Sequence, residues 1–249
     1  MHITDPHLFA DAGGSLRGTV TYDSFRSVLD DIRRSGWAAD LVALTGDLIQ
    51  DDTREAYQHF PGMLAPLELP VLCVPGNHDI RRMMREELAV EPFLYCQTLA
   101  LGNWQIIGID SCIDGTAAGR VGREEMARLE AMAYASGSGH VLVCIHHPPL
   151  PVGSRWLDSV GMQNGPEFLD YLTRIPSVRG VLFGHVHQPL DVRYRSLHII
   201  GTPSTCRQFT IGSDDFAVDD NPPAYRRVEL HANGEITSEL IWLDESRKV

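Results

Sequence analysis

The sequence predicts an α/β fold in which two stacked β-sheets carry helices on their outer faces. Short apolar runs typical of buried strands alternate with helix-like runs through the first half of the chain, and strand-like runs dominate from Asp191 onward. No repeat, low-complexity tract or Pro/Gly/Ser-rich linker divides the 249 residues. We therefore expect a single domain spanning residues 1–249, which is long enough to bury a substantial core.

The first half of the chain predicts alternating strands and helices. Residues 1–4 form the tail of a first strand, which is either short in this chain or begins upstream. Apolar residues recur at helical spacing over 22–36, and Gly36 ends that pattern. The strand, helix and strand that follow are expected at 41–45, 54–64 and 71–74. This alternation predicts parallel strands joined by right-handed crossovers.

The second half contains fewer helices and more strands. A hairpin over 98–110 is expected to turn at Gly102-Asn103, and Pro148-Pro149 ends a later strand. Residues 151–165 are predicted to form a rim or a short cap. The other expected helices are 83–88, 123–135 and 168–173, and the other strand-like runs are 141–145, 181–183, 197–200, 226–230 and 235–243.

The composition is that of a soluble globular protein, with 43% apolar and 22% charged residues. No apolar run is long enough to cross a membrane and no signal-peptide pattern is present, so we expect a cytoplasmic protein without an integral membrane segment. A formal net charge of −12 disfavours nucleic-acid binding, although bound cations can still attract a small anionic substrate. The five scattered cysteines form no C-x-x-C pair and indicate free thiols in a reducing compartment. Oligomer formation is compatible with this composition.

Five of the apolar runs end in the same kind of polar cluster. The clusters are Asp5-Pro6-His7, Gly46-Asp47, Gly76-Asn77-His78-Asp79, His146-His147-Pro148-Pro149 and Gly184-His185-Val186-His187. Open α/β sheets build their sites at such strand ends. Each cluster on its own also fits an ordinary turn, a helix cap or a buried core histidine. Together, five strand ends with Asp, Asn and His side chains predict one metal site.

The donor types narrow the kind of metal. Carboxylates, imidazoles and an amide without a thiolate suit Mn, Fe or Zn rather than a soft-metal centre. Seven side chains are too many for one tetrahedral ion and fit two divalent ions that share the carboxylate of Asp47. In Asp5-x-His7 and His185-x-His187, residues two apart lie on one face of an extended strand, so each pair is expected to converge. The predicted ligands are Asp5, His7, Asp47, Asn77, His146, His185 and His187.

In this order, the five clusters resemble the signature of the calcineurin-like metallophosphoesterases. Within that superfamily, segments 3–10, 56–60, 154–158 and 202–209 look like the bacterial class III cyclic nucleotide phosphodiesterases, in particular the 3',5'-cyclic AMP phosphodiesterases of the CpdA type. The resemblance implies a four-layer α/β/β/α sandwich of two mixed sheets with a dinuclear site at the strand ends.

The resemblance also implies roles for individual residues. It places Asp5, His7, Asp47 and His187 on one ion and Asp47, Asn77, His146 and His185 on the other. The two divalent ions are expected to be Fe or Mn, with Zn or Co possible. Substrate contacts are expected from Asn77, His78 and His187.

Donor chemistry and resemblance together predict hydrolysis of 3',5'-cyclic AMP to 5'-AMP. Two cations can share a water and lower its pKa, so that a metal-bound hydroxide attacks phosphorus. His78 is not one of the predicted metal ligands, and it is the expected general acid for the leaving alkoxide. Asp79 either orients His78 or holds the turn by hydrogen bonds. Trp156 either stacks on the base or packs in the interior.

Other functions remain open from the sequence. A phosphodiesterase of broader specificity would act on glycerophosphodiesters or 2',3'-cyclic nucleotides. A non-catalytic metal-bound scaffold would be expected to lack His78 or a ligand, and this chain has all of them. Arg81 and Arg82 fit solvated surface arginines better than phosphate ligands, and Arg207 is a candidate for a phosphate or nucleobase at the rim.

Overall fold

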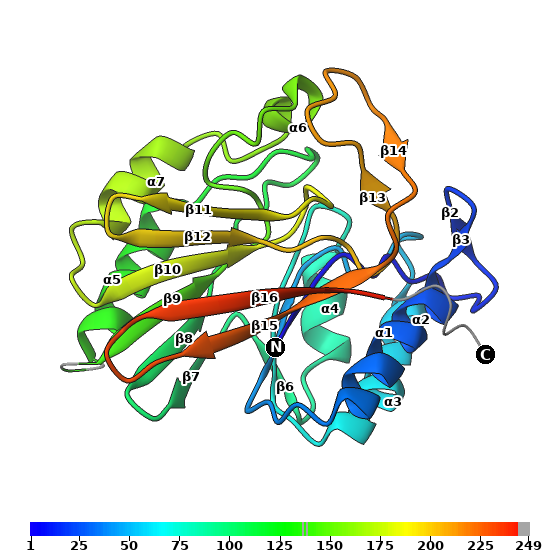
Figure 1. Cartoon of the computed structure of the whole chain (residues 1–249), viewed down its shortest axis with the longest axis horizontal. Helices are drawn as coiled ribbons and strands as arrows, with labels where there is room; N and C mark the ends of the chain where they lie inside the picture. The colour runs from blue at the N-terminus through cyan, green and yellow to red at the C-terminus, as the bar shows by residue number, and fades with distance from the viewer. Residues whose placement is uncertain (136, 138, 244–249) are drawn as a thin grey trace.

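Two six-stranded mixed sheets form the centre of the structure (Figure 1). The structure is a computed structural model that describes residues 1–135, 137 and 139–243. The first sheet contains, in spatial order, β16 (Ile236–Trp242), β15 (Ala224–Leu230), β1 (His2–Ile3), β4 (Val42–Thr45), β5 (Val71–Val74) and β6 (Phe93–Tyr95). Its strands β1, β4, β5 and β6 run parallel, as the alternating pattern predicts, and β15 pairs antiparallel with β1.

The second sheet also has parallel strands at its centre. In spatial order it contains β11 (Leu190–Tyr194), β12 (Leu197–Gly201), β10 (Val178–Phe183), β9 (His140–Cys144), β8 (Trp104–Gly108) and β7 (Thr98–Leu101). Strands β8, β9, β10 and β12 are parallel, and the two edge strands are antiparallel to their neighbours. Two short ribbons complete the strands: β2 (Ser15–Leu16) with β3 (Thr19–Val20), and β13 (Gln208–Phe209) with β14 (Val218–Asp219).

Helices cover the outer face of each sheet. The first sheet carries α1 (Thr21–Ser35), α2 (Arg54–Tyr57), α3 (His59–Leu64), the 3-10 turn η1 (Ala65–Leu67) and α4 (Arg81–Glu87). The second carries α5 (Arg123–Ala135) and α7 (Gly165–Leu172). The short helix α6 (Arg155–Ser159) lies near the β13–β14 ribbon in Figure 1.

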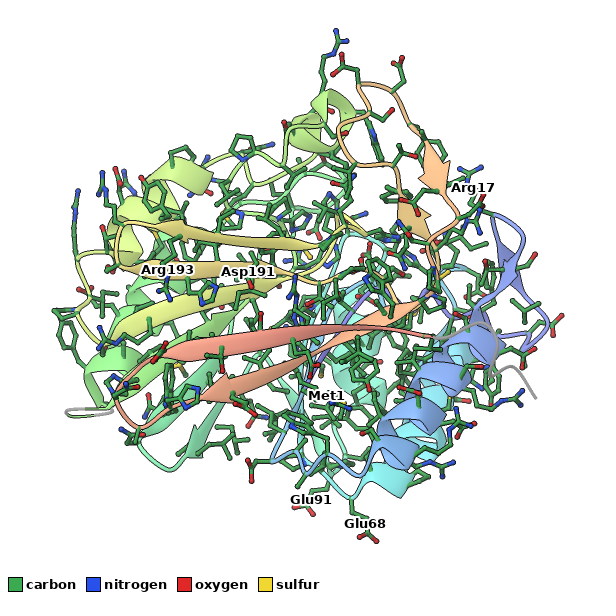
Figure 2. All side chains as sticks on the ribbon, in the orientation of Figure 1. Met1, Arg17, Glu68, Glu91, Asp191 and Arg193 are labelled. Carbon is green, nitrogen blue, oxygen red and sulfur yellow. The ribbon has the colours of Figure 1, made fainter. Side chains whose placement is uncertain are left out.

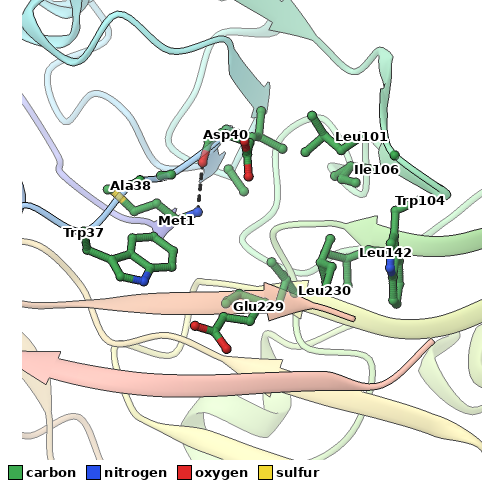
Figure 3. Close-up of a pocket in the computed structure, with 16 residues that line it drawn as sticks. Met1, Trp37, Ala38, Asp40, Leu101, Trp104, Ile106, Leu142, Glu229 and Leu230 are labelled. Atoms are coloured by element: carbon green, nitrogen blue, oxygen red, sulfur yellow. Dashed lines mark hydrogen bonds between the residues drawn. The ribbon is translucent and has the colours of Figure 1, made fainter. Parts of the chain in front are cut away.

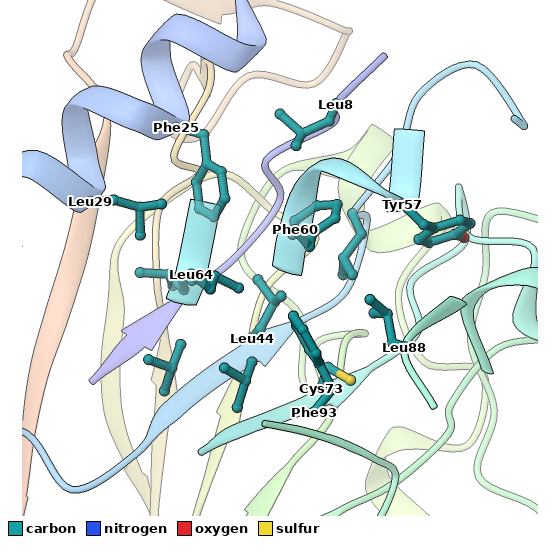
Figure 4. Close-up of a cluster of buried hydrophobic side chains, with 14 of the residues drawn as sticks. Leu8, Phe25, Leu29, Leu44, Tyr57, Phe60, Leu64, Cys73, Leu88 and Phe93 are labelled. Carbon is teal, nitrogen blue, oxygen red and sulfur yellow. The ribbon is translucent and has the colours of Figure 1, made fainter. Parts of the chain in front are cut away.

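The two helix layers and the two sheets form four layers, and apolar side chains fill the three spaces between them. Leu44 points outward to Phe25 of α1 in the cluster that Figure 4 shows. Leu72 points inward and packs in the same cluster as Leu182 of the other sheet. Val143 points outward again, under α5 and α7. Because successive strand residues face opposite ways, each central strand contributes to two layers, and the predicted α/β/β/α sandwich is confirmed.

Element boundaries agree with the sequence in most places and differ in a few. The predicted helix 54–64 is two helices, because Pro61 has no N–H to continue the ladder from α2. The looser region 151–165 contains the five-residue helix α6. The sequence patterns do not predict β2, β3, β6, β11, β13 or β14. All except the five-residue β11 are runs of two or three residues, which carry no periodicity.

A cavity of about 450 Å³ opens between the sheets near the beginnings of their strands (Figure 3). Met1, Leu41 and Trp104 are among its lining residues, and the Met1 amine donates to the Leu41 carbonyl at 2.8 Å. None of the predicted metal ligands lines this cavity. The ligands follow the opposite, carboxyl ends of the strands. Among the described helices, none is both long and apolar enough to cross a bilayer.

Candidate metal centre

All seven predicted ligands lie just beyond the carboxyl ends of five parallel strands. Asp5 and His7 follow β1, Asp47 follows β4 and Asn77 follows β5. His146 follows β9, and His185 and His187 follow β10. Their donor atoms form overlapping groups within 4.8 Å, one of Asp5, His7 and His187 and others that share Asp47 or His146. The two sheets therefore meet at one polar centre, buried apart from part of Asn77.

The paired ligands converge by a different geometry from the one that the sequence suggests. Asp5 and His7 have φ angles of 53° and 49°, and His185 and His187 have 70° and 49°. These are left-handed conformations in loops past the strand ends, so the expectation of an extended strand with one face is wrong. Asp47 shares this conformation, with φ 49°. Strained backbone of this kind concentrates at functional sites, where surrounding structure over-determines it.

A glycine allows the two sheets to approach at this centre. Gly46 has φ 92°, and a Cβ there would lie 2.5 Å from His146 Nδ1 and 2.7 Å from the Gly76 nitrogen. A side chain would therefore displace the ligand His146 or its neighbouring loop.

One half of the centre is built by Asp5, His7 and His187. His187 Nδ1 donates to the Arg207 carbonyl at 2.5 Å, which leaves a lone pair on Nε2. That Nε2 lies 3.2 Å from His7 Nε2 and 3.4 Å from Asp5 Oδ1. Burial lowers the pKa of His7 to about 3, so its imidazole is neutral at pH 7. These donor atoms surround one small space from three sides.

The other half is built by Asn77, His146 and His185. His146 Nδ1 donates to the Thr45 carbonyl at 2.7 Å, so its Nε2 is directed to the centre. There it lies 3.3 Å from Asn77 Oδ1 and 3.2 Å from His185 Nδ1. Burial lowers the pKa of His185 to about 3.

Asp47 lies between these two halves. Its Oδ2 is 3.4 Å from His146 Nε2 and 3.8 Å from His7 Nε2, and its Oδ1 accepts the His78 N–H at 2.8 Å. Burial disfavours a charge on Asp47, but the surrounding histidines more than offset this and hold the pKa of its carboxyl well below the usual range. Burial likewise opposes charge on His146, yet the Asp47 carboxylate raises the pKa of that imidazole to about 9. A carboxylate between two groups of nitrogen donors has the position of a bridging ligand.

The centre fits a pair of divalent cations. Two buried contacts bring acceptor atoms together, His7 Nε2 with His187 Nε2 at 3.2 Å and His187 Nε2 with Asp5 Oδ1 at 3.4 Å, and such contacts are unfavourable unless a proton or a cation lies between the atoms. His7 Nδ1 and His185 Nε2 are buried without a hydrogen-bond partner in the described part of the chain. The donors are carboxylate, imidazole and amide without a thiolate, as the sequence predicts.

His78 and Asp79 have different surroundings. The His78 ring is half-buried, lines the adjoining cavity and lies edge-on to His7 with centroids 5.0 Å apart. The Asp79 carboxylate instead accepts from the backbone nitrogens of Gly76 (2.8 Å) and Leu48 (3.1 Å) and from the Tyr57 hydroxyl (3.0 Å). Burial raises the pKa of Asp79 to about 7.

These contacts separate the two alternatives for Asp79. Its oxygens hold the turn of Gly76 against the loop after β4, and among the described residues the His78 ring is not one of its hydrogen-bond partners. These are the contacts expected for the alternative in which Asp79 holds the turn by hydrogen bonds. His147 is likewise engaged elsewhere, since its ring nitrogens bond to Ser111 Oγ at 2.9 Å and the Ala117 carbonyl at 3.2 Å.

A cavity of about 270 Å³ adjoins the centre. Six predicted site residues line one side: His7, Asp47, Asn77, His78, His185 and His187. Trp156, Phe209 and Phe216 line another side, together with Arg17 and Arg207. The sequence offers no signal for Arg17 or Phe216. Arg17 lies in the turn between β2 and β3, Phe216 lies in the loop between β13 and β14, and only the fold brings the two together.

The arginines considered for phosphate binding differ in their partners. Arg207 lines the cavity but pairs with Asp220 at 2.9 Å. Arg81 pairs with Asp110 at 3.2 Å and also with Asp114. Arg82 has a side chain that is 78% exposed, as a solvated surface residue would have.

Known proteins resemble this chain along almost its whole length. A family model described as calcineurin-like phosphoesterase matches residues 1–189. The 3',5'-cyclic adenosine monophosphate phosphodiesterase CpdA of Vibrio vulnificus is 38% identical over 241 residues, covering 96% of this chain and 88% of that protein. The Escherichia coli K12 protein of the same name is 36% identical over 248 residues, covering 99% and 90%.

Solved structures share the fold at much lower identity. A dimetal phosphatase from Danio rerio has a TM-score of 0.65 at 16% identity, covering 95% of this chain and 96% of that one. An anchor protein of the inner membrane complex of Plasmodium has a TM-score of 0.58 at 12% identity, covering 98% and 88%. At these identities the similarity concerns the fold alone.

Proposed function

The chain belongs to the calcineurin-like phosphoesterase family, and on this premise we propose that it hydrolyses 3',5'-cyclic AMP to 5'-AMP at a centre of two divalent cations. The observation that supports the proposal most is a buried cluster of Asp and His donors, in a chain similar over 96% of its length to a cyclic AMP phosphodiesterase. Fold alone would not support it, because one fold hosts many activities.

The residues proposed to hold the cations are those brought together at the strand ends. Asp5, His7 and His187 would hold one cation, and Asn77, His146 and His185 the other, with Asp47 shared between them. When bound, such a pair lowers the pKa of a water and offsets the charge of the phosphate oxygens. The donor set favours Mn or Fe, with Zn or Co as the other candidates.

His78 is proposed to act as the general acid. Hydrolysis to 5'-AMP adds a water oxygen to phosphorus and breaks the bond from phosphorus to the 3' oxygen, which leaves as a poor alkoxide. His78 lines the cavity. Its backbone N–H donates a hydrogen bond of 2.8 Å to Asp47 Oδ1, which holds the residue beside the centre. A proton from the His78 imidazole would pass to the 3' oxygen as that bond breaks.

Other groups are proposed to place the substrate and the acid. Asn77 and His187 line the cavity and would contact the phosphate together with His78. Asp79 would act indirectly, since its three hydrogen-bond donors fix the turn that carries Asn77 and His78.

Two wider features accompany the proposal. Both sheets supply ligands, so we propose that residues 1–249 work as one domain. The five cysteines are all free thiols, which favours a cytoplasmic enzyme acting on a small molecule.

A panel of substrates tests the proposal. Mn- or Fe-loaded protein should convert 3',5'-cyclic AMP to 5'-AMP, and a chelator should abolish the reaction. The panel includes 3',5'-cyclic GMP, 2',3'-cyclic AMP, a glycerophosphodiester, bis(4-nitrophenyl) phosphate and a phosphomonoester. Cleavage of the aryl diester with 3',5'-cyclic AMP left intact would replace the proposal by a phosphodiesterase of broader specificity. Failure with every ester would favour a binding scaffold.

A further inference from the structure

The cavity beside the metal centre has an aromatic side that the proposed chemistry does not use. Trp156, Phe209 and Phe216, here called the aromatic wall, contact one another edge to face. Their ring centroids lie 5.0 Å apart for Trp156 and Phe209, 5.2 Å for Trp156 and Phe216, and 5.5 Å for the two phenylalanines. Such contacts stabilise aromatic pairs beyond the apolar area that they bury.

Phe216 is the unusual member of the aromatic wall. Its side chain is 47% exposed, although aromatic rings of this size are usually buried. The Arg17 guanidinium lies 4.8 Å from the centre of the Phe216 ring, within the range of a cation–π contact. Figure 2 labels Arg17 on the ribbon of β2 and β3, beside β14. Arg17 forms no ion pair with any of the described residues, and the Phe216 ring is its cation–π partner.

The elements that carry the wall are tied together. Arg155 of α6 pairs with Asp214 at 2.6 Å, and the Ser154 hydroxyl donates to the Ser213 carbonyl. These bonds join α6 to the loop between β13 and β14, which carries Phe216. The wall is therefore formed before any ligand binds, and a ligand need not order it.

The aromatic wall begins at the metal centre itself. The Phe209 ring is stacked on the imidazole of His187, with centroids 4.2 Å apart and planes 13° apart. A ligand whose phosphate lies among the proposed metal ligands can reach Trp156 and Phe216 with its other end, because all these residues line one cavity of about 270 Å³. The cavity thus has aromatic rings beside an anion site.

We propose that the aromatic wall binds the nucleobase of the substrate by stacking, chiefly on Phe216 and Trp156, and that Arg17 holds the Phe216 ring in place. The substrate in this statement rests on the proposed function. A nucleobase presents a flat π-face to such rings whatever its hydrogen-bonding edge. The wall therefore discriminates nucleotides from base-free phosphodiesters and favours the larger purine face over a pyrimidine.

The test compares ligands with and without a base in one variant. Phe216→Ala should lower kcat/KM for 3',5'-cyclic AMP by about 5- to 150-fold, the usual worth of stacking one base. Its kcat/KM for the 3',5'-cyclic phosphate of 1-O-methylribose should stay within twofold of wild type. Ile211→Ala is the matched control, because Ile211 is also exposed (60%), lies in the same loop and does not line the cavity.

Binding of products provides a second measurement that needs no turnover. Calorimetry with the metal-loaded protein should show that Phe216→Ala weakens the binding of 5'-AMP much more than the binding of ribose 5-phosphate. Phe216→Leu, which keeps apolar volume but removes the ring, should behave like Phe216→Ala and so exclude a general packing defect. Equal weakening of both ligands, or none, would overturn the inference. If the protein fails to cleave cyclic AMP, a base-dependent loss of 5'-AMP binding still supports the wall while the proposed function fails.

Discussion

Gly184 is the position where the end of β10 comes closest to the loop after β1. A Cβ there would lie 2.0 Å from Thr4 Oγ1 and 2.6 Å from Asp5 Oδ2, whereas ordinary contacts begin at 3.4 Å. The φ angle of Gly184 is not positive, so an alanine at this position would meet a steric clash but no backbone strain. Gly184→Ala therefore perturbs the proposed metal ligand Asp5 directly.

The size of the effect follows from how firmly Asp5 is held. Its Oδ2 accepts from the Thr4 hydroxyl at 2.6 Å and from the His185 N–H at 3.1 Å, so its side chain cannot simply rotate away. Relief of the clash needs a shift of roughly 1 Å, and a misplacement of that size costs about 100-fold in rate. Overpacking of this kind also costs about 1–3 kcal/mol, out of a total stability of roughly 5–15 kcal/mol.

Three measurements on Gly184→Ala test this reasoning. We expect a folded protein by urea denaturation, kcat/KM reduced about 100-fold, and less metal per chain than wild type by mass spectrometry. Gly62→Ala is the matched control, because the Cβ added to this helical glycine in α3 meets nothing within 4 Å. It should be more stable by about 0.5–1 kcal/mol and fully active. Full metal content with activity within twofold of wild type in Gly184→Ala would refute the argument.

Three further predictions concern the bridge, the acid and a buried histidine. Asp47→Ala should lose metal and activity together, and two ions per chain with normal turnover would contradict the bridging assignment. His78→Ala should keep its metal but lose roughly 10²–10⁴-fold in turnover of cyclic AMP, and much less with a nitrophenolate leaving group, which needs no proton; equal losses would exclude an acid role. Burial lowers the pKa of His2 to about 3, below its unfolded value near 6.5. His2 thus stabilises the fold fully above pH 6.5 and loses that contribution toward pH 3, by up to about 1.4 kcal/mol per pH unit; His2→Gln should flatten this slope in denaturation curves, and an unchanged slope would exclude His2 as its source.

Local patterns in the sequence predict much of the fold. The helix at Arg123–Ala135 has the predicted bounds, and Gly36 ends α1 in the left-handed conformation that favours glycine. The hairpin turns at Gly102-Asn103 between β7 and β8 as predicted. These features depend on residues close together in the chain, so periodicity and turn chemistry are enough to find them. The split of helix 54–64 is local too, and Pro61 could have indicated it.

The chemistry of the centre is also visible in the sequence, because residue type and strand-end position need no partner. Asp, Asn and His after five apolar runs predict the donor set and its meeting at the carboxyl ends of the strands. The number and kind of donors also predict that Asp47 is shared between two ions. The sequence does not determine the path of the backbone at the strand ends. The extended geometry expected for Asp5 and His7 is wrong for this reason.

Only the tertiary structure decides which atoms face one another. The left-handed backbone of Asp5 is held between Thr4, His185 and Ser204, and residues 180 or more apart supply two of those three contacts. The hydrogen bond from His187 Nδ1 to the Arg207 carbonyl leaves Nε2 of that ring to face the centre. Hydrogen bonds from Leu48 and Tyr57 give Asp79 its role in holding the turn. The aromatic wall and Arg17 come together from three separate segments. Such long-range contacts have no local pattern, because each partner contributes only half of the interaction and the fold alone brings the halves together.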